Sequence, residues 1–298
     1  MQDNSLVTVI CLCYNHEKFV TESLLSVINQ DYPFVELIIV DDCSTDNSKT
    51  IISDWLKKNP KVQFIANETN LGNTKSFNKA LKFAKGEFII DLAADDILLP
   101  NCISLQLKKF KESRYKKLGI VYGNAELITE EGAFDSCFFP LDENKKTIEN
   151  RPTGDIYLSV LSGGNSICSV SAMIKKTVFD HLGGFDENLG YEDLDFWIRT
   201  CRLYEVDFID EILIQKRITT NSLGTHFYIK KDPKARKINY STYLIIKKAI
   251  ALNQSKTEHK AILKRIHFEM ILAYKNADFK LMFRYFLLEI KQRIRTLL

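Results

Sequence analysis

Short apolar runs alternate with amphipathic segments over the first third of the chain. Apolar runs of strand length, rich in β-branched residues, lie at 6–12, 35–40, 62–65 and 87–92. Between them apolar residues recur at helical spacing, which predicts a helix after the first strand and further helices over 47–58 and 75–85. This alternation predicts an α/β fold with a mostly parallel, doubly wound central sheet and helices on both faces. Such sheets bind ligands at the carboxyl ends of their strands.

The pattern changes twice further along the chain. A less regular section has strand-like pieces at 119–122, 169–174 and 211–214 and a helix predicted over 193–203. From residue 230 onward only helical periodicity remains. One predicted helix carries an apolar stripe of Phe279, Met282, Phe283, Phe286, Leu287, Ile290 and Ile294. We predict an α/β domain over 1–229, with halves 1–118 and 119–229, and a helical C-terminal extension over 230–298.

Composition narrows the class of protein. An apolar content of 45% supplies ample core and excludes extensive disorder. The polar start indicates no signal peptide, and no stretch has the length of a membrane span. Seven scattered cysteines are typical of reduced thiols in a cytoplasmic protein, and the five histidines do not cluster as a zinc site would.

The net charge of +3 is unevenly distributed. From Lys230 onward the chain has 17 basic and 5 acidic residues, against 24 basic and 33 acidic before it. The acidic body argues against broad nucleic-acid binding. The basic tail could instead contact an anionic surface.

Acidic residues follow the second predicted strand. Asp46 is well placed to cap the next helix. Capping explains Asp41 and Asp42 poorly, because adjacent carboxylates repel and the helix starts further on. A carboxylate at this edge of the sheet could accept hydrogen bonds from a nucleobase or a ribose, and we favour that interpretation for Asp42.

A second acidic pair, Asp95 and Asp96, follows the fourth predicted strand between apolar residues. One of the two could cap a helix that begins near Asn101, which leaves the other unexplained. Two hard oxygen ligands at a strand end suit Mg²⁺ or Mn²⁺, which proteins usually share with substrate phosphates and water.

These segments together resemble the family 2 glycosyltransferases, inverting enzymes with the GT-A fold that act in bacterial glycan biosynthesis. The resemblance covers roughly residues 5–225. It rests on the first strand through Tyr14-Asn15, the stretch 36–46, Asn70-Leu-Gly72, residues 84–89, Ala94-Asp-Asp96, Gly183-Gly-Phe-Asp-Glu187 and Glu192-Asp193. An Asp is commonest where this chain has Ala93.

The resemblance implies a role for each matching residue. Asp42 would read the nucleotide base, with Tyr14 beside it. Asp95 and Asp96 would hold the ribose and the metal ion, in an order the sequence does not fix. Asp193 would be the catalytic base, with Glu192 orienting the acceptor or the base. The alternative for Asp193 is a helix N-terminal cap.

Three weaker features follow. Lys216 and Arg217 come after the late strand and could hold the diphosphate of the donor, or be a solvated pair. The segment 221–226 resembles a loop that closes over the donor; its His226 could be a metal ligand or merely structural. Residues 163–165 could line an acceptor site or form a turn.

The predicted function is metal-dependent transfer of a sugar from a nucleotide-diphosphate donor, a UDP-sugar being favoured. The acceptor would be a glycan or lipid-linked saccharide in surface polysaccharide biosynthesis. The alternative is a catalytically idle nucleotide-sugar-binding or scaffold protein, suggested by Ala93. We expect a cytoplasmic location. The basic tail could add peripheral contact with the inner face of the membrane, or its apolar stripe could pack on the catalytic domain.

Overall fold

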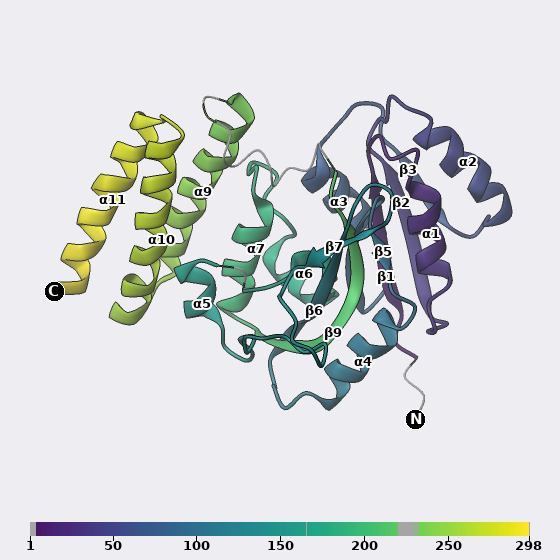
Figure 1. Ribbon diagram of the computed structural model, residues 1–298, viewed down its shortest axis with the longest axis horizontal. Coiled ribbons are helices and arrows are strands. Elements are labelled where there is room, and N and C mark those ends of the chain that lie inside the picture. Colours follow the sequence, from purple (N-terminus) through teal and green to yellow (C-terminus); the bar gives the residue numbers. More distant parts are fainter. Residues whose placement is uncertain (1–3, 165, 220–229, 231, 298) are drawn as a thin grey trace. The chain divides into compact units, whose positions relative to one another are not determined.

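The computed structural model describes residues 4–164, 166–219, 230 and 232–297, and its strands form one mixed sheet (Figure 1). The strand order is β3-β2-β1-β4-β8-β6-β9-β5, and β7 pairs with β6 at the side. The first four strands are parallel: β1 (Val7–Cys13), β2 (Val35–Asp41), β3 (Gln63–Ala66) and β4 (Phe88–Ala93). The predicted α/β fold with a parallel, doubly wound section is confirmed.

Three helices connect these strands. They are α1 (Val20–Ile28), α2 (Ser48–Lys58) and α3 (Asn73–Leu81). Figure 1 shows α1 and α2 on one side of the parallel strands and α3 on the other, as expected for right-handed crossovers that first move outward from β1 and then return past it. All seven residues of β1 are buried because the strand is covered on both faces. The carboxyl ends of β1, β2, β3 and β4 therefore lie at one edge of the sheet.

The other half of the sheet is mixed. It contains β5 (Ile97–Leu98), β6 (Leu118–Ile128), β7 (Phe134–Cys137), β8 (Met173–Lys175) and β9 (Glu205–Arg217), with α4 (Cys102–Glu112) and α6 (Lys176–Leu182). Strand β8 runs antiparallel to both β4 and β6, and β9 runs parallel to β6 and antiparallel to β5. This pairing brings the end of β9 to the segment that follows β4.

The strand predicted over 169–174 is only partly correct. Residues Ser169–Ser171 form a short 3-10 helix, and the strand itself is β8. The hydroxyl of Ser171 donates to the carbonyls of Gly123 and Cys168, so local hydrogen bonds replace the expected ladder. Strands β6 and β9 are longer than predicted, and their pairing contains register shifts that interrupt a regular alternation.

The chain divides into two compact units. One contains residues 1–154, 167–185 and 205–218 and holds the whole sheet; the other contains 155–166, 186–204 and 219–298. The helices of the second unit are α5 (Tyr157–Ser162), α7 (Glu192–Cys201), α9 (Pro233–Leu252), α10 (Lys256–Lys275) and α11 (Phe279–Leu297). The second compact unit thus contains α5 and α7 as well as the C-terminal helices. The limit of the catalytic domain near residue 229 stays a prediction.

The C-terminal helices have clear local and packing causes. Helix α10 begins with a capping box, in which the Ser255 hydroxyl accepts from the Glu258 amide and the Glu258 carboxylate accepts from the Ser255 amide. Two contacts tie the helical unit together: Tyr157 donates to Asn253 at 2.9 Å, and Arg202 pairs with Glu258 at 2.6 Å. Among the described helices, none combines the length and the hydropathy of a membrane span.

Candidate active site

Two loops at the carboxyl ends of β1 and β2 are hydrogen-bonded to each other. The amide of Asn15 donates to Ser44 Oγ at 3.0 Å, and the Asn15 side chain accepts from the Thr45 amide at 2.7 Å. Asp46 accepts from the amides of Glu17 and Ser48, the first residue of α2. The N-cap of α2 is Asn47, so Asp46 binds a free helix amide from the position before the cap. These bonds fix the loop that carries Tyr14, whose side chain is 44% exposed and available for stacking on a planar ligand.

Asp42 is buried at the carboxyl end of β2 and accepts four hydrogen bonds. Its Oδ1 accepts from Asn67 Nδ2, the Leu71 amide and Ser76 Oγ, and its Oδ2 accepts from the Gly72 amide, all at 2.8–2.9 Å. The carboxylate therefore shapes the turn before α3, where Gly72 has a φ of +83°. The expected contact of Asp42 with a base stays a prediction, and it would add to this positioning role.

Asp95 and Asp96 lie in the turn between β4 and β5, and neither caps α4. The N-cap of α4 is Asn101, and Asp96 Oδ1 instead accepts from the Arg217 amide on β9 at 2.9 Å. Burial, and next the neighbouring Asp95 carboxylate, raises the pKa of Asp96 to about 8. Because the ionised form of Asp96 is unfavourable at this strand end, a bound cation nearby would stabilise it.

His16 is a neighbour of this pair that the sequence analysis did not identify. Its Nε2 lies 3.8 Å from Asp95 Oδ2. The contact joins the loop after β1 to the loop after β4, which are adjacent strands of the sheet. The available sequence signal was its position directly after Tyr14-Asn15. His16 is therefore an additional candidate for contact with a ligand at this edge.

Arg217 is buried, and its guanidinium is mostly occupied by protein groups. Its Nε donates to the Asp95 carbonyl, its Nη1 to the carbonyls of Thr129 and Glu130, and its Nη2 to Glu22 at 2.8 Å. The group also lies over the Phe19 ring at 4.6 Å. These contacts give Arg217 a structural role: it connects the turn of Asp95 with residues 129–130 and with Glu22. A role of Arg217 in donor binding stays a prediction.

Lys216 differs from its neighbour. It is half-buried at the end of β9, and none of the described residues forms a hydrogen bond or ion pair with its ammonium group. Its charge opposes the rise in the pKa of Asp96, and its neighbour Arg217 donates a backbone amide to the same carboxylate. Of the two predicted cations, Lys216 is the better candidate for holding an anionic ligand.

The carboxylates of Asp95 and Asp96 suit a divalent cation that the substrate also helps to hold. Carboxylates are hard oxygen donors of the kind that Mg²⁺ and Mn²⁺ prefer. Within the described residues no cluster of three or more His, Cys, Asp or Glu could hold a metal ion alone. The assignment of Asp95 and Asp96 as metal ligands therefore stays a prediction, which requires further oxygen ligands from substrate or water.

Glu192 and Asp193 belong to the second unit, in the first turn of α7. The N-cap of this helix is Tyr191, so Asp193 is not the cap. Both side chains are half-buried in the first turn of the helix, where acidic residues interact favourably with the helix dipole. Asp195, two residues on, is buried and points elsewhere: it accepts from Arg199 at 2.7 Å and from Lys248 at 3.0 Å.

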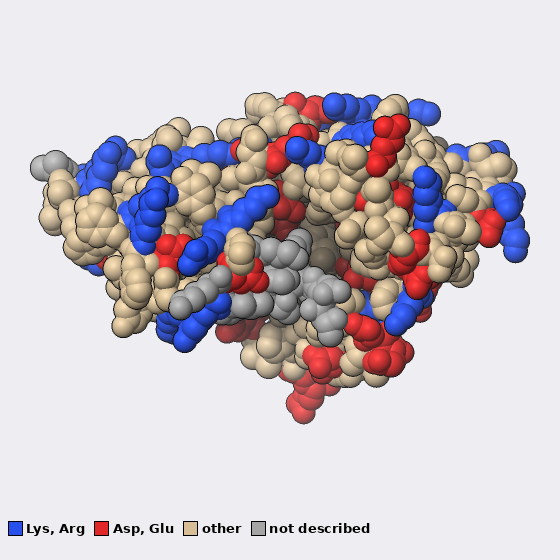
Figure 2. All heavy atoms as spheres, turned by 90° about the horizontal axis from the view of Figure 1, so that it is seen from above, with Lys and Arg blue, Asp and Glu red and all other residues tan. Residues whose placement is uncertain are grey.

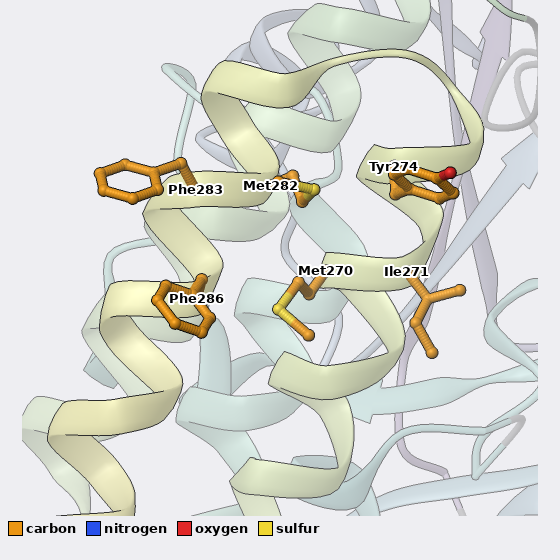
Figure 3. Close-up of a pocket in the computed structure, with 6 residues that line it drawn as sticks. All are labelled: Met270, Ile271, Tyr274, Met282, Phe283 and Phe286. Carbon is orange, nitrogen blue, oxygen red and sulfur yellow. The ribbon is translucent and has the colours of Figure 1, made fainter.

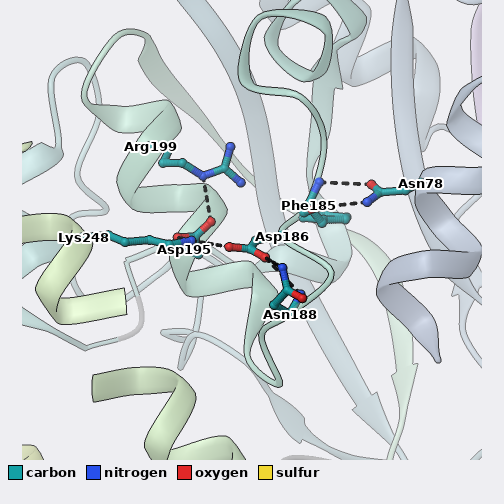
Figure 4. Close-up of polar contacts among 7 residues, drawn as sticks. All are labelled: Asn78, Phe185, Asp186, Asn188, Asp195, Arg199 and Lys248. Carbon is teal, nitrogen blue, oxygen red and sulfur yellow. Dashed lines mark hydrogen bonds and ion pairs between the residues drawn. The ribbon is translucent and has the colours of Figure 1, made fainter. Parts of the chain in front are cut away.

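The segment before α7 is fixed at both ends (Figure 4). At its start, the Asn78 side chain donates to the Phe185 carbonyl and accepts from the Phe185 amide. A Cβ atom on Gly184, where φ is +79°, would lie 2.6 Å from Asn78 Oδ1, so the close approach requires glycine. In the second unit Lys248 of α9 donates to both Asp186 and Asp195, which joins the beginning of this segment to α7.

The sheet unit therefore gathers Tyr14, Asp42, Asp95, Asp96, Lys216 and Arg217 at one edge, and the helical unit presents Glu192 and Asp193. Two weaker predictions fall outside the described residues: segment 221–226 with His226, and Asn165. Gly163 and Gly164 have φ values of +93° and +96°, consistent with the turn alternative.

Comparisons with known proteins show the family of the chain. The family model for glycosyl transferase family 2 matches residues 8–183. An uncharacterized glycosyltransferase of Methanocaldococcus jannaschii is 30% identical over 80% of this chain and 79% of its own length. The poly-beta-1,6-N-acetyl-D-glucosamine synthase of Staphylococcus epidermidis is 29% identical over 63% of this chain, which corresponds to 44% of that enzyme.

Solved structures show the same fold. The crystal structure of S. aureus TarS 1–349 in complex with UDP-GlcNAc covers 90% of this chain and 75% of its own, with a TM-score of 0.67 and 18% identity. The mannosyltransferase PcManGT from Pyrobaculum calidifontis, in complex with GDP-Man and Mn²⁺, has a TM-score of 0.53 and 17% identity over 98% of this chain and 85% of its own.

Proposed function

The chain belongs to glycosyl transferase family 2 and is a glycosyltransferase, and we propose that it transfers a sugar with inversion from a nucleotide-diphosphate donor. The observation that carries the proposal is the carboxylate pair at the carboxyl end of β4, in which Asp96 is buried and Asp95 is half-buried. Arg217, the neighbour of the half-buried cation Lys216, donates its backbone amide to Asp96, and the charge of Lys216 opposes the rise in the pKa of Asp96. Carboxylates, a cation and a loop with an exposed aromatic ring are the groups that a metal–diphosphate and a base require.

On the donor side, Tyr14 stacks on or borders the base and Asp42 accepts from it. Asp95 and Asp96 hold the ribose and the Mn²⁺ or Mg²⁺ ion, and Lys216 contacts the diphosphate. The bound metal neutralises the charge that grows on the departing diphosphate. The complexes of TarS with UDP-GlcNAc and of PcManGT with GDP-Man support a nucleotide sugar as donor, and the first favours a UDP-sugar.

On the acceptor side, Asp193 removes a proton from a sugar hydroxyl as that oxygen attacks the anomeric carbon. The bond from this carbon to the diphosphate breaks on the opposite face, so the configuration inverts. Glu192 orients the acceptor or the base. The negative charge of Asp193 suits this task, because a general base must be ionised before it accepts a proton.

We propose a glycan or lipid-linked saccharide as the acceptor, in the synthesis of a surface polysaccharide. The similarity to a poly-N-acetylglucosamine synthase and the fold shared with TarS support this class of pathway. The proposal includes a cytoplasmic location, where nucleotide sugars are made, with peripheral contact at the inner face of the membrane.

The substitution Asp193→Asn tests the proposal. We expect turnover to fall by about 10²–10⁴-fold, the usual contribution of a general base, while the thermal stabilisation by a nucleotide sugar with Mn²⁺ stays as in the wild type. Asp95→Asn is the matched substitution on the donor side and should reduce that stabilisation. Unchanged turnover in Asp193→Asn would remove this residue from the mechanism. Donor binding without turnover in the wild type, over all acceptors tried, would favour the idle-binding alternative.

A further inference from the structure

The apolar stripe predicted on α11 is exposed. Within the described residues, α11 buries Leu281, Tyr285, Glu289 and Gln292 instead. The exposed apolar residues of α11 continue onto its neighbour α10. We call this surface the α10–α11 face, and its residues are Phe268, Ile271, Tyr274, Phe279, Phe283, Phe286, Leu287, Ile290 and Ile294, each 41–62% exposed. Soluble proteins rarely leave so many large apolar side chains together in water.

The α10–α11 face is hollowed where the two helices meet (Figure 3). An open pocket of about 430 Å³ is lined by Met270, Ile271, Tyr274, Met282, Phe283 and Phe286. Figure 3 shows the two methionines between the helices, where their flexible side chains form an adaptable floor. Such a surface can accept apolar chains of irregular shape.

Positive charge surrounds the α10–α11 face. Residues 256–297 contain ten basic and four acidic residues. Three of the four acids are paired within the helical unit: Glu258 with Arg202, Glu269 with Arg265, and Glu289 with Arg293. The fourth, Asp278, accepts from the Leu281 amide at the start of α11. The exposed lysines therefore have no acidic counterpart on this surface.

The lysines lie beside the apolar residues rather than opposite them. At 3.6 residues per turn, Lys264, Phe268, Ile271 and Lys275 fall along one exposed line of α10, and Lys280 and Lys291 flank the stripe of α11. Figure 2 shows Lys and Arg side chains among uncharged ones over the C-terminal helices, at the left of the view. This is the pattern of a surface that meets an apolar layer with anionic headgroups above it.

We propose that the α10–α11 face docks on a bilayer of anionic phospholipid, with both helices lying in the interface. The aromatic and aliphatic side chains enter the acyl boundary and the lysines contact the phosphates. A second copy of the chain is a poorer occupant, because a two-fold interface would bring the lysine-rich surface against itself. This inference rests on the membrane contact included in the proposed function and assigns it to a surface, but it does not depend on the transfer reaction.

The test is flotation of the purified full chain with vesicles. We expect binding to phosphatidylcholine vesicles that contain phosphatidylglycerol, weaker binding at high salt, and little binding to phosphatidylcholine alone. Phe283→Ser with Phe286→Ser should lower the partition coefficient at least about tenfold. Lys264→Gln, Lys280→Gln and Lys291→Gln together should lower it about a hundredfold, since each lysine near an anionic surface contributes about a fivefold factor.

The matched control is Phe83→Ser, because Phe83 is 48% exposed and lies after α3, in the sheet unit and not among the residues of this surface. It should float like the wild type. The lysine variant keeps the apolar core intact, so it remains informative if the Phe variant proves unstable. Equal binding to both kinds of vesicle would overturn the proposal. The proposal would also be overturned if the wild-type chain failed to float and instead formed a concentration-dependent dimer that the Phe variant abolishes.

Discussion

Two adjacent cations at the end of β9 have different surroundings. Four of the N–H groups of Arg217 donate to the Asp95 carbonyl, two further carbonyls and Glu22, whereas Lys216 has no hydrogen-bond or ion-pair partner in the described part of the chain. A buried cation with this many partners organises the protein around it. A half-buried cation without partners is available to a ligand.

We therefore expect Arg217→Met and Lys216→Met to fail in different assays. Arg217→Met should lower the free energy of unfolding by about 3 kcal/mol, because it leaves the carbonyls of Asp95, Thr129 and Glu130 without their donor. Lys216→Met should change it by less than about 0.5 kcal/mol and weaken donor binding about tenfold. Chemical denaturation and nucleotide-sugar titration measure the two quantities. Equal stability losses in both variants would contradict this division.

The sequence could indicate these residues but not their separate tasks. Lys216 and Arg217 are neighbours of the same charge at the end of a predicted strand. Glu22, which binds Arg217, is 195 residues away in the chain. Likewise the four donors to Asp42 come from residues 25 to 34 positions later, so its saturation is visible only in the fold.

At the scale of elements, α7 is oriented through its buried side. Lys248 of α9 donates to Asp186 before the helix and to Asp195 in the first turn of the helix, which also contains Asp193 (Figure 4). Burial by itself would raise the pKa of Asp186, but hydrogen bonds from Lys248 and from the Asn188 backbone hold it below its ordinary 3.8. Lys248 is thus a positioning residue for the start of α7.

Lys248→Met should destabilise the protein by about 1–2 kcal/mol near neutral pH, since Asp195 keeps Arg199 as a partner. The pKa of Asp186 is lowered, so its contribution is fully present above pH 3.8 and is lost as the pH falls through the folded-state value. The difference from the wild type should therefore shrink below pH 3.8. Denaturation at several pH values checks this, with Lys247→Met as the neighbouring control. A difference that persists in acid would exclude the ion pair as the cause.

The elements of the parallel section were predictable because strands buried on both faces are continuous apolar runs. Strands β6 and β9 extend past their apolar pieces through Gly123-Asn124 and through charged positions, where register shifts break the alternation. The periodicity correctly predicted the helix α11 and the apolar stripe along it. It could not show that the stripe would stay exposed while Leu281 and Tyr285 are buried, because that choice depends on packing against α9 and α10.

At the scale of the whole molecule, the proposed chemistry is divided between two units. The proposed donor residues lie in the sheet unit, and Glu192 and Asp193 lie in the helical unit with the basic tail. The net charge of +3 is therefore an average of an acidic part, in which Asp95 and Asp96 would hold a cation, and a basic part with an exposed apolar face. The tail contributes to the fold around α7 as well as to the proposed membrane contact.

Removing residues 230–298 should therefore abolish transfer while nucleotide-sugar binding with Mn²⁺ persists. The deletion takes away Lys248 from Asp195 and Asn253 from Tyr157, and it exposes the surfaces that Ile245, Ile246 and Ala249 of α9 bury. The sheet keeps all of its strand pairs, because none of them involves this segment. Donor titration and a transfer assay on the truncated chain separate the two effects. Transfer at the wild-type rate would show that α7 needs no support from the helices, and loss of donor binding would show that the sheet itself depends on them.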